Sequence, residues 1–120
     1  MHAVNKQVLA NQSGLASFDT GWIPVGASGF RNISFTAAWL AAASTAFVLS
    51  VEGTDDPAQA STSAVPLTLT ATHGTWPNVG TSAGNALVAV SDAPAYVRLK
   101  GTRSAGGAAN QFNVWATVTE

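Results

Sequence analysis

Strict alternation of apolar and polar residues is the feature that most constrains the fold of this chain. It runs through four segments, which are 32–39 (NISFTAAW), 46–53 (AFVLSVEG), 65–72 (VPLTLTAT) and 111–118 (QFNVWATV). Because successive side chains of a strand point to opposite faces, such alternation is typical of strands with one buried face. The apolar phase supplies the aromatic core candidates Phe35, Trp39, Phe47 and Phe112.

The rest of the chain extends this pattern into an all-β fold. Main strands are predicted at about 29–39, 45–53, 65–73, 85–91, 95–101 and 110–119, with shorter ones in 5–10 (NKQVLA) and 21–26 (GWIPVG). Segments rich in Gly, Pro, Asn, Asp and Ser separate them. This rhythm predicts an antiparallel β-sandwich of seven to eight strands. The alanine-rich segment 37–44 (AAWLAAAS) is interpreted as a strand end followed by a loop.

A length of 120 residues indicates one domain. We expect residues 15–120 to form a single β-sandwich domain, and residues 1–14 to form an N-terminal arm or an edge strand. No stretch is apolar enough to span a membrane, and the N-terminal segment has no long apolar run of the secretory type. The sequence contains no cysteine, so no disulfide or thiolate chemistry is expected.

Charge is unusually scarce. Only 9% of the residues are charged and the net charge is −1, whereas about 25% is usual for globular domains. Five scattered basic residues do not form the basic face that nucleic-acid binding requires. A surface of Ser, Thr, Asn, Gly and Ala suits a protein packed against copies of itself or against a larger lattice, although secreted binding modules also carry such surfaces.

Three short motifs carry a resemblance to a known group of proteins. The segment 51–56 (VEGTDD) ends a predicted strand, 96–99 (YVRL) begins another, and 112–114 (FNV) lies in the last one. Together with 21–35 (GWIPVGASGFRNISF), they resemble small structural proteins of tailed bacteriophages. The resemblance implies a β-sandwich of the jelly-roll type and a role on the virion as a head decoration, or cement, protein.

The paired acids Asp55 and Asp56 have four alternative interpretations. An EF-hand loop would require a closing Glu at position 66, which is Pro66. A catalytic pair would require carboxylates on different elements, so that the fold would have to bring in Asp19 or Asp92. The preferred interpretation is a turn, in which Asp bonds to nearby backbone and proline fixes the bend. A cation site shared with a neighbouring subunit is the remaining alternative.

The histidines offer no stronger site. His73, Asp92 and a serine could be assembled into a triad, but serines are so frequent that the match carries no information, and no Gly-x-Ser-x-Gly elbow occurs. His2 and His73 alone fall short of a metal-binding set. We therefore expect no catalytic residue, no metal and no cofactor, and we expect that the protein is not an enzyme.

Several apolar residues instead indicate contact surfaces. Trp115 lies on the polar phase of its strand, so it faces a partner or is covered by a loop. Trp22 and Trp76 stand beside prolines, and they could cap the ends of the sandwich or stack on sugars. Residues near the N-terminus could add a strand to a neighbour. The interface candidates are Trp115, Val4, Val8, Leu9, Trp22 and Trp76.

Two functions follow as expectations. The first is a non-catalytic virion structural protein, a decoration protein on the capsid surface. It would bind the major capsid protein or other virion proteins as a homo-oligomer, without nucleic acid or membrane. The alternative is a receptor-binding or glycan-binding β-sandwich module of a tail fibre or a secreted protein.

Overall fold

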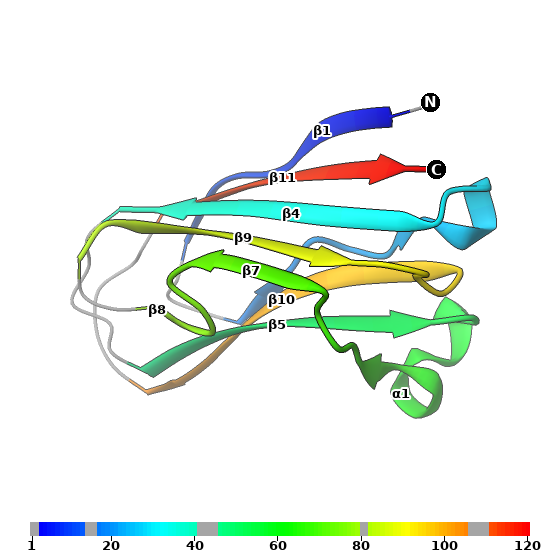
Figure 1. Cartoon of the computed structure of the whole chain (residues 1–120). Helices are drawn as coiled ribbons and strands as arrows, with labels where there is room; N and C mark the ends of the chain where they lie inside the picture. The colour runs from blue at the N-terminus through cyan, green and yellow to red at the C-terminus, as the bar shows by residue number, and fades with distance from the viewer. Residues whose placement is uncertain (1–2, 14–16, 41–45, 80–81, 106–110) are drawn as a thin grey trace.

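The computed structural model describes residues 3–13, 17–40, 46–79, 82–105 and 111–120. These residues form two antiparallel sheets that pack as a sandwich, with the first and last strands side by side (Figure 1). The all-β, antiparallel sandwich predicted from the alternation is therefore confirmed. None of the helices within the described ranges has the length and apolar character needed to cross a membrane.

The five-stranded sheet has the order β1–β11–β4–β9–β7. Its members are β1 (Ala3–Ser13), β11 (Gln111–Thr119), β4 (Asn32–Trp39), β9 (Gly84–Val90) and β7 (Ala71–Gly74). The N-terminal segment is thus an edge strand that pairs with β11, from Ala3 opposite Thr119 to Ser13 opposite Gln111. Register shifts interrupt this pairing between Gln7 and Leu9 and again between Leu9 and Gln12.

The six-stranded sheet is built around two long strands, β5 (Ala46–Thr54) and β10 (Tyr96–Ala105). Two short strands, β2 (Phe18–Asp19) and β3 (Ile23–Pro24), pair with the edge of β10 that is opposite β5. Two others, β6 (Val65–Pro66) and β8 (Asn78–Val79), pair with the edge of β5 that is opposite β10. The 3₁₀ turns η1 (Gly26–Ser28) and η2 (Pro57–Gln59) and the single-turn helix α1 (Ala60–Ser63) lie in the connections.

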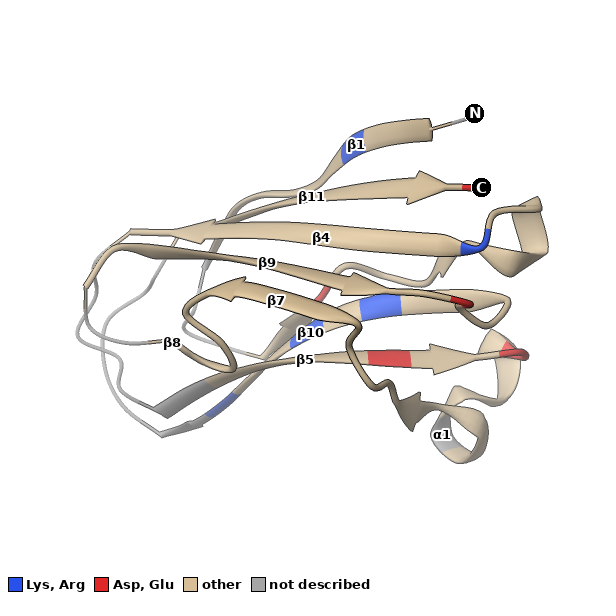
Figure 2. Cartoon of the chain, in the orientation of Figure 1, with Lys and Arg blue, Asp and Glu red and all other residues tan. Residues whose placement is uncertain are grey.

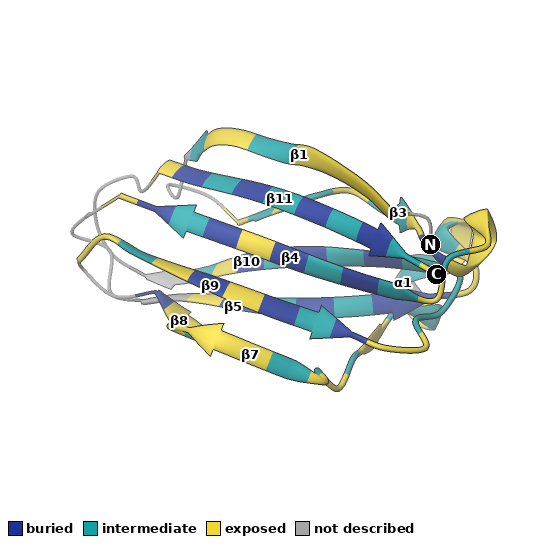
Figure 3. Ribbon diagram, turned by 45° about the horizontal axis from the view of Figure 1, so that its top comes forward, coloured by how far each residue is buried: buried dark blue, intermediate teal, exposed yellow. Residues whose placement is uncertain are grey.

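The core fills the space between the sheets, and it follows the predicted phases. Buried residues alternate with partly exposed ones along β4 and β11 (Figure 3). Phe35, Trp39 and Phe112 are buried as predicted, and the Phe112 ring packs against Trp39 and Phe18. Phe47 lies in β5, but its side chain is outside the described part.

One predicted strand is wrong. The segment 65–73 was expected to be continuous, but it divides into β6 in one sheet and β7 in the other. The backbone shows the crossing, since Leu67 N donates to Val51 O in the six-stranded sheet and Thr70 N donates to Ala89 O beside the five-stranded one. Alternation persists through the crossing because Leu67 and Leu69 still turn toward the core.

Smaller differences concern strand ends and number. Residues 29–31 precede β4 because η1 and the left-handed Gly29 turn the chain there. β10 extends to Ala105, beyond the predicted end at 101. Eleven strands occur in the described ranges rather than seven or eight, since pieces such as β2 and β8 have only two residues. The part of 37–44 from residue 41 onward lies outside the described residues.

Candidate interaction surfaces

A straight row of side chains crosses the outer face of the five-stranded sheet. Pairing places Trp115 of β11 beside Gln7 of β1 and Thr36 of β4. The same row continues from Thr36 to Leu87 of β9 and from Leu87 to His73 of β7. Residues opposite one another in paired strands share a face, so these five side chains point outward together. The expected outward position of Trp115 agrees with its partial exposure.

Leu87 is the residue in this row that the sequence analysis missed. Its side chain is 38% exposed, so this apolar group is available for contact beside Trp115. The signal was present, because Leu87 has the opposite phase to the buried Ala86, Val88 and Val90. Trp115 and Leu87 are separated by Thr36, so they present an aromatic and an aliphatic group on one flat face.

The outer face of this sheet carries no formal charge. Within the described strands, β11, β4, β9 and β7 contain no Lys, Arg, Asp or Glu, as Figure 2 shows. Lys6 is the one charged residue of β1, and it faces the cleft between the sheets. The outer polar groups partly satisfy one another, since Asn5 Nδ2 donates to Thr117 Oγ1 at 2.6 Å and Gln7 Nε2 donates to Asn113 Oδ1 at 3.3 Å.

The outer face of the six-stranded sheet has the opposite character. Arg98 Nε and one terminal nitrogen each lie 2.8 Å from Glu52 Oε1 on the paired strand. The Arg98 guanidinium also lies 4.3 Å from the centre of the Trp22 ring, a cation–π geometry. Lys100 Nζ lies 3.6 Å from Glu52 Oε1. Asp19 Oδ2 lies 3.8 Å from a terminal nitrogen of Arg98. We call these five residues the Arg98 cluster.

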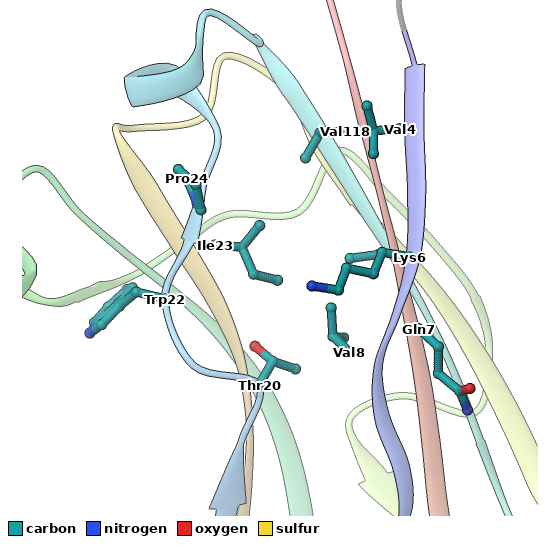
Figure 4. Close-up of a pocket in the computed structure, with 10 residues that line it drawn as sticks. Val4, Lys6, Gln7, Val8, Thr20, Trp22, Ile23, Pro24 and Val118 are labelled. Carbon is teal, nitrogen blue, oxygen red and sulfur yellow. The ribbon is translucent and has the colours of Figure 1, made fainter.

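A cleft of about 350 Å³ opens between the edges of the two sheets, where β1 faces the β2–β3 segment. Apolar residues of both sheets line it, including Val4, Val8 and Ile23. Lys6 points its ammonium group across the cleft, whereas the Trp22 ring turns away from it (Figure 4). The structure therefore places three of the sequence candidates, Val4, Val8 and Trp22, around one opening.

The remaining interface candidates have structural roles. Leu9 and Trp76 are both partly buried and pack against the core. Trp22 and Trp115 occupy the outer faces of opposite sheets. The three tryptophans therefore do not form a common platform for a sugar.

The paired acids have separate hydrogen-bonding roles. Asp56 Oδ1 accepts from Ala58 N at 3.1 Å and caps η2, which is the predicted turn role. Asp55 Oδ1 instead accepts from Ala95 N at 3.1 Å, and so ties this turn to the connection before β10. Among the described residues, no three His, Cys, Asp or Glu side chains are grouped as a metal site.

The fold does not assemble the triad considered from the sequence. Asp92 forms an ion pair with Arg31, while His73 lies in the outward row opposite Leu87. His2 lies outside the described residues. Asp19 and Glu52 both contact Arg98, whose terminal nitrogens lie 3.8 Å and 2.8 Å from their carboxylate oxygens. This arrangement is typical of an ion-pair network that links strands.

Comparisons with protein families, with curated proteins and with solved structures find no match for this chain.

Proposed function

We propose that this chain is a non-catalytic structural subunit of a bacteriophage particle. It decorates the outside of the capsid and contacts the major capsid protein or neighbouring copies through the outer face of its five-stranded sheet. The observation that carries this proposal is the formally uncharged outer face with Trp115 and Leu87 in one row.

Such a face is suited to burial in an assembly. Removing charged side chains from water is costly unless each finds a partner, and this face has none to desolvate. Its Asn, Gln and Thr side chains already bond across β1 and β11. Tryptophan is enriched among the residues that dominate binding energy, so Trp115 is the expected anchor of the contact.

Two of the three phage-like motifs, 51–56 and 96–99, lie on paired strands, which supports the resemblance. β5 and β10 pair so that Gly53 lies opposite Val97 and Glu52 opposite Arg98. A side chain at position 53 is disfavoured, because an added Cβ would lie 2.5 Å from Pro94 Cγ. The strand orders of the two sheets also support the jelly-roll type, since long strands that are consecutive in the chain, β4 and β5 or β9, β10 and β11, lie in alternate sheets.

The mechanism would be stabilisation by mass action. A protein that binds only the assembled shell stabilises it by about 2.7 kcal/mol per site when its free concentration is one hundred times Kd. Many copies on one particle multiply this effect without any catalytic group.

The test is association with virions. Particles from the source lysate are purified on a density gradient and probed for the chain by mass spectrometry, and particles stripped of it are then incubated with the purified protein. We expect the chain to co-sediment with particles, and Trp115→Ala to reduce rebinding. A chain that is absent from purified particles and does not rebind contradicts the proposal.

A second candidate is favoured by the Arg98 cluster. Glycan-binding modules combine an aromatic platform with charged hydrogen-bonding partners, and Trp22 stands beside Arg98 and Glu52. This arrangement supports the alternative of a receptor-binding or glycan-binding module. A glycan array distinguishes the two functions: sugar binding that is lost in Trp22→Ala but retained in Trp115→Ala supports the module.

A further inference from the structure

The edge of β1 has an open side. Among the described strands, β1 pairs only with β11, so the backbone groups along its other side have no strand partner there. Such an edge is a template for an added strand. The other edges of the two sheets are shorter, since β7 has four residues and β2, β3, β6 and β8 have two each.

Only part of this edge is regular enough to continue a ladder. The pairing of β1 with β11 is in uniform register from Ala3 to Gln7, and the shifts begin after Gln7. A bulge bends a strand and interrupts pairing. An added strand would therefore align with Ala3–Gln7, and this segment also lines the cleft.

The inward side chains beside the edge are incompletely covered. Val4 is 49% exposed, and Val8 and Ile23 are only partly buried against the core. Since alternate side chains of an added strand point inward, its apolar residues would cover these groups and close the side of the sandwich.

The charge of Lys6 restricts which strands can be added to this edge. Its ammonium group lies over the cleft (Figure 4), and none of the ion pairs among the described residues includes it. An inward lysine on an edge strand opposes ordinary strand addition, because the added strand would cover an unpaired charge. An inward carboxylate on the added strand would remove that penalty.

We propose that the β1 edge binds an extended segment of a partner protein by strand addition. The segment carries one Asp or Glu facing Lys6, with apolar residues two positions away on each side. This inference goes beyond the proposed function, since it concerns a different surface from the Trp115 face.

A second copy of the chain is a poor source of that segment. Asp92 is the only acidic residue with apolar residues two positions away on both sides, Val90 and Pro94. Val90 is buried in the core and Asp92 is paired with Arg31. The required pattern is therefore expected in a different protein.

The experiment supplies the strand in the same molecule. A seven-residue segment, Thr-Val-Thr-Glu-Thr-Val-Thr, is fused before residue 1 through Gly-Asn-Gly, so that its last threonine is designed to align with Ala3 and its glutamate with Lys6. The fusion gives the segment a high effective concentration. A matched fusion replaces the central glutamate with lysine. A third fusion carries prolines at two threonine positions and cannot form the ladder. Each fusion is made in the natural chain and in Lys6→Glu.

We expect the glutamate fusion to raise Tm by roughly 4 °C or more over the proline fusion, a shift that corresponds to about 1 kcal/mol for a domain of this size. The lysine fusion should raise it less. In the Lys6→Glu background, the lysine fusion should raise Tm more than the glutamate fusion does. Hydrogen exchange should slow at amides of Ala3–Gln7 in the glutamate fusion.

Two results overturn the inference. If neither charged fusion differs from the proline fusion in Tm or in exchange, the edge does not accept a strand. If both raise Tm equally in both backgrounds, a strand adds without recognition by Lys6. The proposed virion function is unaffected by either result, because its test concerns the Trp115 face.

Discussion

Replacing Phe112 should mainly destabilise the free domain, whereas replacing Trp115 should mainly weaken binding to particles, although both aromatic residues lie in β11. Phe112 is 0% exposed and packs against two other rings, and Phe→Ala in a core costs about 3–5 kcal/mol. Trp115 is partly exposed and its cross-strand neighbours are Gln7 and Thr36. Each such pair contributes about 0.2–1 kcal/mol. Trp115→Ala should therefore cost about 1 kcal/mol.

Urea unfolding followed by circular dichroism measures both free energies. Sedimentation with purified particles measures binding, where Trp115→Ala should lose about 2 kcal/mol, or roughly 30-fold in Kd. A β-dominated spectrum in each variant shows that the fold is kept. The reasoning is refuted if Trp115→Ala destabilises the free domain by as much as Phe112→Ala, because Trp115 would then act as a core residue.

Three further predictions concern the end of β5 and the turn that follows it. Gly53→Ala should lower the unfolding free energy by about 1–3 kcal/mol in thermal melts, because its Cβ would overlap Pro94; an unchanged Tm would show that the neighbours yield freely. Thr54→Val should cost about 1–3 kcal/mol, since the buried hydroxyl bonds both Asp56 N and Asp56 O, and a neutral effect would contradict this. EDTA should leave Tm unchanged, because Asp55 and Asp56 are engaged by backbone amides; a loss of several degrees that calcium restores would reveal a cation site.

For the long strands β4, β5, β9, β10 and β11, the sequence alone located most of the extended residues, and in β4 and β11 it also indicated the buried face. In β4 and β11 the phase of alternation predicts the buried Phe35 and Phe112 and the outward Trp115. This works because the two-residue period is local: each side chain's direction follows from its neighbours in the chain. The turn role of Asp56 is local for the same reason, since its carboxylate bonds an amide two residues away.

Only the tertiary structure decided which surfaces these faces form. Alternation continues from Val65 to Ala71, yet the chain changes sheets within that segment, because apolar residues can face the core from a crossing as well as from a strand. The meeting of Trp115 with Leu87 across Thr36 depends on register among three strands. The stacking of Arg98 on Trp22 and the position of Lys6 over the open cleft depend on which strands become edges. Those choices follow from the packing of the whole chain, and no local period encodes them.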